Sequence, residues 1–186
     1  SLECGCRVKA YCLMDNHVNL LLVPLEGVAL DKTMQKLSLT FTQHINKKYK
    51  RTGRLWECRF HSCLVDKDVY LWAVCKYIER NPVRAGIVVY PQEYSWSSAR
   101  ISTVLNCQDN WVEPVWKDYL GSREEYAKFL NQAELEKELE EMQKAVFSGK
   151  PIGTEQFLEM MHKQQAGINM IIRSAGRPRK ENGMCP

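Results

Sequence analysis

His17 and Asn19 are two polar residues with metal-binding chemistry, separated by one apolar residue, Val18. Alternate side chains of an extended segment project from one face, so the imidazole and the amide would lie side by side. An imidazole nitrogen and an amide oxygen in that arrangement can hold a divalent cation or orient a phosphate. A single histidine at the start of a strand is more often structural, so this pair alone leaves both interpretations open.

Tyr77 and Asn81 form a second pair, four residues apart near the end of an expected helix. Residues with this spacing share one helix face. The phenol is a potential nucleophile, and the amide carbonyl is a potential metal ligand. A tyrosine on an amphipathic helix is more often half-buried packing, so this pair is also ambiguous by itself.

A basic stretch follows the first expected helix, and aromatic side chains interleave with it. Residues 1–101 contain 15 Lys or Arg and 9 Asp or Glu, whereas residues 102–186 contain 11 and 13. Cations and rings together suit a single-stranded nucleic acid, although a solvated helix end and loop would look the same. The candidate DNA contacts are Lys47, Lys48, Lys50, Arg51, Arg54 and Arg59, among Tyr49, Trp56 and Phe60. Trp56 and Trp96 are more typical of a core than of a base-stacking surface.

The elements that must position these groups follow from apolar spacing. They are strands at 7–14 and 17–23, a helix at 30–50, an extended segment at 55–65 and a helix ending near residue 80. Asp15 and Asn16 favour a turn between the strands, Asp66 or Asp68 is expected to cap the last helix, and Pro82 limits it. The order β-β-α-β-α predicts an α+β fold of antiparallel sheet and helices.

The second part of the chain, residues 102–172, is expected to be a helical extension. One acidic amphipathic helix is predicted at about 123–147, with a solvated charged face, and a short helix follows with Thr154 as its N-cap. The apolar stripe of the acidic helix comprises Phe129, Leu130, Leu135, Leu139 and Met142. Residues 173–186 are basic and rich in Gly and Pro, which predicts a disordered tail. A Gly-Arg-Pro segment can also lie in a DNA minor groove.

Composition excludes several classes of protein. A chain of 186 residues with 45% hydrophobic residues and a net charge of +4 is typical of one folded domain with an appendage, not of a disordered protein. No apolar run reaches about 18 residues and no signal peptide is evident, so we expect a cytoplasmic protein without a membrane span. Eight cysteines lack any C-x-x-C pair, which favours reduced packing cysteines over zinc or disulfides.

Several ordered motifs together resemble the single-tyrosine HUH transposases of insertion sequences, and most of all the REP-associated tyrosine transposases. The motifs are Tyr11-x-x-Met14-x-Asn16-His17-Val18-x-Leu20-Leu21-Leu22, Leu55-Trp56, Arg59-Phe60, Tyr77-Ile78-Glu79-Arg80-Asn81-Pro82-Val83-Arg84-Ala85-Gly86-Ile87-Val88 and Tyr94-Ser95-Trp96-Ser97-Ser98. The resemblance extends over nearly the whole chain, including the Gly149-Lys150-Pro151-Ile152-Gly153 segment and the basic tail.

The resemblance implies a ferredoxin-like or RRM-like antiparallel sheet backed by helices, with residues 1–101 as the catalytic domain. In that family, two histidines flanking a hydrophobic residue hold Mg²⁺ or Mn²⁺ at the scissile phosphate of single-stranded DNA. A helical tyrosine attacks the phosphate, leaving a 5′-phosphotyrosine and a free 3′-hydroxyl. Carried over, His17 is the first metal ligand, Tyr77 the nucleophile and Asn81 a further amide ligand. Arg84 is expected to contact DNA phosphate or to offset the helix dipole.

Two features depart from the family pattern. Asn19 replaces the second histidine; its amide still offers an oxygen to Mg²⁺ but is a weaker ligand for Mn²⁺. A second interpretation therefore stays open, namely a degenerate or domesticated protein that recognises hairpin repeats without efficient cleavage. The family domain also begins with a strand and a helix before the hairpin, whereas this sequence starts close to the hairpin itself. If these elements are absent from the natural protein, the sheet exposes an edge, and either the gene is a decayed remnant or a partner chain fills the gap. Because relatives form dimers, we expect a homodimer, in a bacterial, nucleoid-associated protein.

Overall fold

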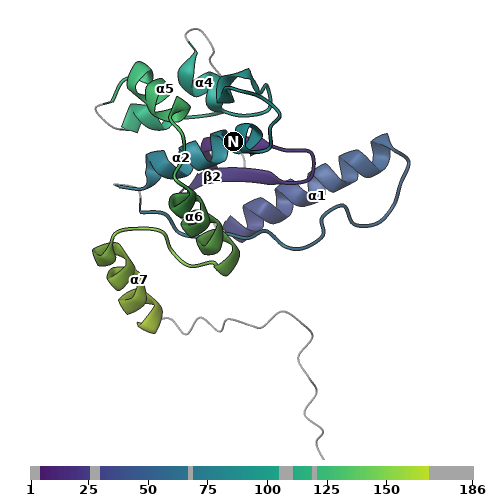
Figure 1. Ribbon diagram of the computed structural model, residues 1–186. Helices are drawn as coiled ribbons and strands as arrows, with labels where there is room; N and C mark the ends of the chain where they lie inside the picture. The colour runs from purple at the N-terminus through teal and green to yellow at the C-terminus, as the bar shows by residue number, and fades with distance from the viewer. Residues whose placement is uncertain (1–4, 26–29, 67–68, 105–110, 119–120, 168–186) are drawn as a thin grey trace, which may run out of the picture.

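The computed structural model describes residues 5–25, 30–66, 69–104, 111–118 and 121–167. Its first two elements form an antiparallel hairpin of strand β1, Cys6–Leu13, and strand β2, Val18–Pro24 (Figure 1). Tyr11 lies opposite Leu20 in the ladder. Each strand begins and ends within one residue of its predicted range, because side-chain alternation and the turn at Asp15 and Asn16 define both strands.

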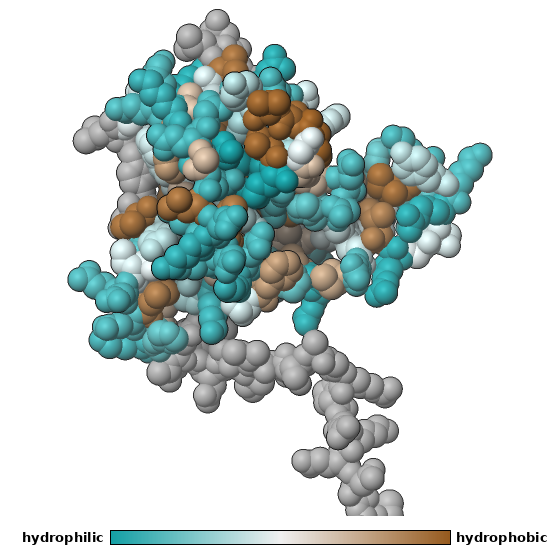
Figure 2. All heavy atoms as spheres, in the orientation of Figure 1, coloured by the Kyte–Doolittle hydropathy of each residue, from teal (hydrophilic) through white to brown (hydrophobic). Residues whose placement is uncertain are grey.

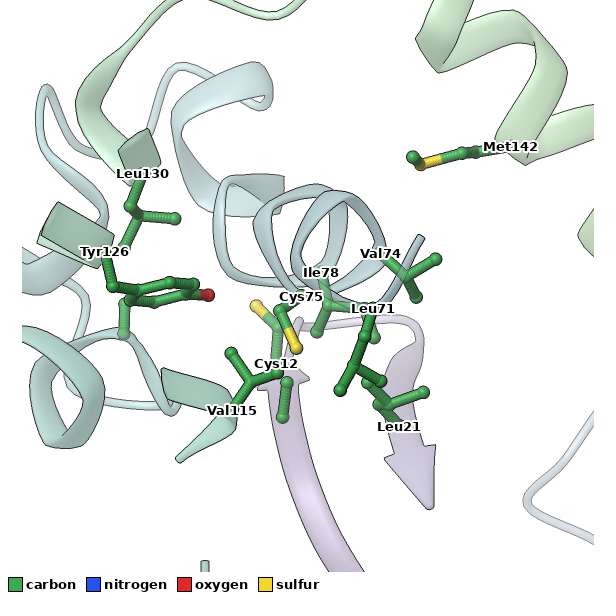
Figure 3. Packing of buried hydrophobic residues seen from close by; sticks show 12 residues of the cluster. Cys12, Leu21, Leu71, Val74, Cys75, Ile78, Val115, Tyr126, Leu130 and Met142 are labelled. Carbon is green, nitrogen blue, oxygen red and sulfur yellow. The ribbon is translucent and has the colours of Figure 1, made fainter. Parts of the chain in front are cut away.

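Helix α2, Leu71–Glu79, packs against this hairpin and forms the centre of the main hydrophobic core (Figures 1 and 3). The helical period turns one side of α2 toward the strands and another toward later helices. The core includes Ala10, Cys12 and Leu21 from the hairpin, Leu71, Val74, Cys75 and Ile78 from α2, and Val115, Tyr126, Leu130 and Met142 from later elements. Full burial of an aliphatic side chain such as Ile78 stabilises the fold by about 1.5–3 kcal/mol.

The short helix α3, Asn81–Arg84, follows α2 after Arg80 and has Pro82 in its first turn. Proline has no backbone N–H and is tolerated in the first turn of a helix, so α2 ends at Glu79 and a new turn begins, as predicted. Asp66 is not the N-cap of α2, because Tyr70 occupies that position, without a side-chain bond. Asp66 instead accepts hydrogen bonds from Thr154, and Asp68 lies outside the described residues.

The chain that follows α3 covers the outer side of β1. This region contains the 3-10 turn η2, Pro91–Glu93, helix α4, Ala99–Thr103, and the 3-10 turn η3, Val115–Asp118. Isolated bridges join Cys12 to Ser97 and Val8 to Val112. Strand β1 is therefore enclosed, whereas β2 pairs only with β1 within the described ranges.

The third strand predicted at 55–65 is not formed. This segment is irregular, and its bridge joins Val65 to Ile152. Phe60 and Leu64 are 42% and 56% exposed, so the segment has no buried face of the kind that holds a strand in a sheet. The described sheet is two-stranded, and the α+β class predicted from the sequence is confirmed.

The prediction of a single helix at 123–147 is wrong, because the structure has two helices with a break between them. They are α5, Arg123–Asn131, and α6, Glu136–Ser148, and α7, Glu155–Gly167, follows. Gln132 and Leu135 are extended, with ψ of 146° and 132°. Two cations at the end of α2 bind the carbonyls freed at the break: Arg80, just after the helix, donates to the Leu130 carbonyl at 2.8 Å and Lys76 donates to the Ala133 carbonyl at 3.4 Å. These contacts replace the helical bonds that a continuous helix would have made.

The N-cap predicted for the last helix is confirmed. The Thr154 hydroxyl accepts a hydrogen bond from the Phe157 backbone N–H at 3.3 Å. The five described cysteines, Cys6, Cys12, Cys58, Cys63 and Cys75, are all free, as expected. The predicted basic tail at 173–186 lies outside the described residues.

Helix α1, Leu30–Lys48, begins near the start of β1 and projects away from the rest of the molecule (Figure 1). Only Thr33 of α1 is fully buried. In Figure 2 the projecting part is mostly hydrophilic, with a hydrophobic patch among the polar side chains. None of the helices in the described ranges combines the length and hydropathy needed to span a membrane.

Candidate active site

His17 and Asn81, which are far apart in the sequence, meet at the turn end of the hairpin. A hydrogen bond from the Met14 backbone N–H to the His17 carbonyl, at 2.9 Å, closes the turn. This turn places His17 Nε2 2.8 Å from Asn81 Nδ2, at the start of α3. The structure therefore brings together two of the three predicted metal ligands, and it leaves His17 exposed to solvent.

The tautomer of His17 follows from its other contact. His17 Nδ1 lies 2.7 Å from Asn16 Oδ1. An amide oxygen can only accept, so Nδ1 carries the proton and Nε2 keeps a lone pair, which accepts from the Asn81 amide. A neutral imidazole with a lone pair on Nε2 is the form that binds metals. The hydrogen bond at Nδ1 fixes the orientation of the ring.

Asn19, the third predicted ligand, lies two residues further along, within β2 and opposite Cys12. It is half-buried. In the described part of the chain, no hydrogen bond joins its amide to His17 or to Asn81. The proximity of His17 and Asn19 thus depends on strand alternation alone.

These side chains carry atoms of the kinds that hold a divalent cation, namely the Nε2 lone pair of His17 and the amide oxygens of Asn81 and Asn19, and amide oxygens suit Mg²⁺ better than Mn²⁺. Asn81 presents its amide nitrogen to His17, so its oxygen would face a cation only after the amide rotates. No cluster of three or more His, Cys, Asp or Glu side chains with metal-site geometry occurs in the ranges that the structure describes. A cation here would be held by a neutral set of ligands.

Tyr77, the predicted nucleophile, lies one helical turn before Asn81 and is half-buried against the main core. The Arg84 guanidinium carbon lies 4.4 Å from the centroid of its ring, and Arg84 Nη2 donates to the Tyr77 carbonyl at 2.6 Å. A guanidinium over an aromatic face is an attractive cation–π contact. The Tyr77 ring thus has the core on one side and a fixed cation on another.

Arg84 does not lie with the other predicted DNA contacts. Its Nη1 donates to Glu134 Oε1 at 2.8 Å, while Arg80 Nε donates to Glu134 Oε2 at 3.1 Å. Glu134 comes from the break between α5 and α6, and its side chain is 9% exposed. The sequence gives no signal for this ion pair, since Glu134 falls within a run of glutamates assigned to a solvated helix face.

Glu79 is a second residue that the sequence analysis missed. It is fully buried and accepts hydrogen bonds from the hydroxyls of Ser98, Ser102 and Tyr126 at 2.6, 2.9 and 2.9 Å. Burial raises the pKa of its carboxyl from 4.5 to about 7, and the three hydrogen bonds oppose that rise. This cluster ties α2, two residues after Tyr77, to α4 and α5. The sequence signal that could have identified Glu79 was a single carboxylate among the apolar residues of the helix.

The remaining predicted DNA contacts form an exposed basic surface at the end of α1 and in the loop that follows. It consists of Lys47, Lys48, Lys50, Arg51, Arg54 and Arg59. The loop is folded back on α1: Asn46 Nδ2 donates to the Gly53 carbonyl at 2.8 Å, and Trp56 Nε1 donates to the Ser38 carbonyl at 3.2 Å. The Trp56 ring also contacts Phe41, with centroids 5.8 Å apart. These anchors fix where the cations are presented.

The prediction that Trp96 belongs to the core is wrong, because this residue is 64% exposed. Its carbonyl accepts from the Leu13 backbone N–H at 2.9 Å, so it lies beside the end of β1 that leads to the His17 turn. An exposed indole next to a candidate phosphate site is the type of side chain on which unpaired bases stack.

Comparison with known proteins identifies the family. Residues 1–81 match the family model described as "Transposase IS200 like". The match includes His17, the basic surface and Tyr77, and it ends at Asn81. No curated protein and no solved structure matches the chain. The resemblance drawn from the motifs is confirmed for residues 1–81, which are similar to the IS200-like transposases, proteins of DNA transposition.

Proposed function

We propose that this protein cleaves and rejoins single-stranded DNA, using Tyr77 as the nucleophile. The observation that carries the proposal is the 2.8 Å contact between His17 Nε2 and Asn81 Nδ2, one helical turn from Tyr77. It supports the proposal because a residue of the hairpin turn and a residue just after α2 meet although 64 positions separate them in the sequence. The match of residues 1–81 to the IS200-like transposase family model supports it independently.

In the proposed reaction, the Tyr77 phenol oxygen attacks the phosphorus of the scissile phosphate. The Oη–P bond forms, the P–O3′ bond breaks, and the departing 3′ oxygen takes up a proton to become a hydroxyl. The phenol proton leaves to solvent or to a nearby base as the bond forms. The 5′-phosphotyrosine conserves the bond energy, so that a 3′-hydroxyl can later reverse the reaction and join the strand.

We propose Mg²⁺ or Mn²⁺ as the cofactor, with His17, Asn19 and Asn81 as its ligands. A bound cation would neutralise charge on the phosphate and orient it for in-line attack. His17 contributes the Nε2 lone pair, already set by the bond at Nδ1. Asn81 presents its nitrogen to His17 in the structure, and rotation of its amide would present the oxygen instead.

The basic surface is the proposed binding site for the phosphates of single-stranded or hairpin DNA. Its six cations are exposed and lie on one helix end and one anchored loop. We also propose a homodimer, in which a second copy covers the open edge of β2. Exposed apolar side chains on α1, including Leu37 and Phe41 at 45% each, support such an interface.

The experiment is to incubate the full chain with end-labelled single-stranded DNA carrying hairpin repeats, together with Mg²⁺ or Mn²⁺. A covalent protein–DNA adduct on a denaturing gel is expected for the natural protein, and Tyr77→Phe should abolish it. Tyr70→Phe is the matched control, because it removes a phenol from the start of the same helix and should leave the adduct. An adduct that persists in Tyr77→Phe would exclude Tyr77 as the nucleophile.

A second candidate function is a DNA-binding protein that recognises hairpin repeats without efficient cleavage. The replacement of the second histidine by Asn19, which has no hydrogen bond to His17 in the described structure, favours it. Hairpin binding without an adduct would support this function. Asn19→His separates the two: a large gain in adduct formation would mean that the natural ligand set is impaired, whereas no gain would mean that Asn19 suffices.

A further inference from the structure

We propose that Glu134 is a positioning residue for Tyr77, and that it acts through Arg84. This inference rests on the function proposed above. It adds a residue from outside the segment that matches the transposase family, since that match ends at Asn81.

The first link joins Glu134 to the end of α2. Both carboxylate oxygens are used: Oε1 accepts from Arg84 Nη1 at 2.8 Å and Oε2 accepts from Arg80 Nε at 3.1 Å. The side chains of Glu134, Arg80 and Arg84 are 9%, 12% and 20% exposed. Ion pairs with so little access to water are weakly screened and geometrically defined, unlike those on an open surface.

The second link joins Arg84 to Tyr77. Arg84 makes a cation–π contact with the Tyr77 ring at 4.4 Å and a hydrogen bond to the Tyr77 carbonyl at 2.6 Å. The guanidinium is planar, so fixing one edge on Glu134 and another on a carbonyl also fixes the plane that faces the ring. The orientation of the Tyr77 side chain is therefore coupled to the carboxylate of Glu134.

The third link explains how Glu134 reaches this place. Residues 132–135 are not helical, and the break is anchored by the Arg80 bond to Leu130 and the Lys76 bond to Ala133. Lys76 Nζ also lies 4.5 Å from the centroid of the Phe129 ring. A continuous helix would lack these anchors, so the break itself is what presents Glu134 to the two arginines.

A purely structural clamp would hold α2 against α5 without affecting Tyr77, so the test must separate the two roles. Glu134→Gln keeps the size of the side chain but removes the charge that holds Arg84. We expect the rate of adduct formation at saturating DNA to fall by about 5- to 30-fold, the scale of one desolvated cation–π contact. The affinity for uncleaved DNA should change less than twofold. Glu138→Gln is the matched control, because this exposed glutamate lines the same small hollow beside Phe129 and should leave the rate unchanged.

A spectroscopic measurement on the same variants reads the geometry directly. The side-chain N–H resonances of Arg84 should be displaced by the ring current of Tyr77, and Tyr77→Leu assigns that displacement. It should shrink in Glu134→Gln and persist in Glu138→Gln. Should Glu134→Gln fail to fold, Arg84→Lys tests the same link. It keeps a charge for Glu134 but loses the planar group, and the same loss of rate is expected.

The outcomes are distinguishable. A normal rate in Glu134→Gln, with an adduct in the natural protein, would overturn this inference and leave the proposed function intact; a normal rate in Arg84→Lys would do the same. No adduct in the natural protein would overturn the proposed function and this inference together. A reduced rate with an unchanged Arg84 resonance would mean that Glu134 acts on the fold and not on Tyr77, which also contradicts the proposal.

Discussion

Helices α1 and α2 both follow from clear helical patterns, yet they have opposite roles in the molecule. Helix α1 has 19 residues and only Thr33 is buried, whereas α2 has nine residues of which six are buried. The groups proposed to carry out the chemistry, Tyr77 and the neighbouring Asn81, lie on or beside α2. The cations proposed to bind single-stranded DNA lie at the end of α1 and in the loop that follows it. Packing, and not helix length, decides which helix can position a reacting atom.

The largest effect is expected from removing the buried carboxylate of α2. Glu79→Ala removes the acceptor shared by three buried hydroxyls and creates a cavity, so the free energy of unfolding should fall by about 3–5 kcal/mol. Urea-induced unfolding followed by circular dichroism measures it. The matched change on α1, Leu39→Ala, removes a side chain that is 55% exposed and should cost under about 0.5 kcal/mol. If the two variants lost similar amounts of unfolding free energy, α1 and α2 would not differ in how much their packing stabilises the fold.

The next largest effect is a pH dependence of the unfolding free energy, which comes from Glu79 on α2. The pKa of Glu79 is raised from 4.5 to about 7 in the folded state, chiefly by burial. The folded state therefore binds more protons than the unfolded state between these values. Stability from this group is fully present below about pH 4.5 and declines as the pH rises to about 7, by about 3 kcal/mol in total.

The variant Glu79→Gln isolates this contribution. It cannot titrate, so the difference in unfolding free energy between the natural protein and the variant should change across pH 4.5–7 and be flat above pH 8. A constant difference throughout would show that the carboxyl does not titrate in this range.

A smaller effect, on DNA affinity and not on stability, is expected at the end of α1. The double change Lys47→Ala and Lys48→Ala removes two exposed cations and should weaken binding of single-stranded DNA by about tenfold at moderate salt. The slope of log affinity against log salt concentration should decrease by about 1–1.5. Fluorescence anisotropy across a salt series measures both quantities. An unchanged slope would place the DNA elsewhere on the molecule.

The sequence predicts the part of the fold that depends on local pattern. Alternation gives both strands of the hairpin to within one residue, and the i, i+4 spacing places Tyr77 and Asn81 on one face of the chain near Pro82. That His17 would meet Asn81 could be anticipated only through the family resemblance, because nothing in the spacing joins residues so far apart.

The features that the sequence did not predict depend on tertiary contacts. The break at 132–135 has no Gly or Pro to mark it, and it is stabilised by Lys76 of α2 and by Arg80 and Arg84, which follow α2. The Glu134 side chain is therefore only 9% exposed, although its sequence neighbours are exposed. Likewise, the segment at 55–65 has strand-like residues but no neighbouring strand to pair with in the described sheet. Local β-propensity indicates that a segment can form a strand, but it does not show whether a neighbouring strand is available to pair with it.

The most direct test of the central claim is to locate the DNA on the protein. The covalent adduct, formed with Mg²⁺ or Mn²⁺ and treated with nuclease, can be digested with trypsin, which cleaves after Lys76 and Arg80. Mass spectrometry should then find residues 77–80 carrying a nucleotide linked through its 5′-phosphate to Tyr77. A nucleotide on another tyrosine, or no nucleotide-bearing peptide at all, would contradict the assignment of the active site to the end of α2.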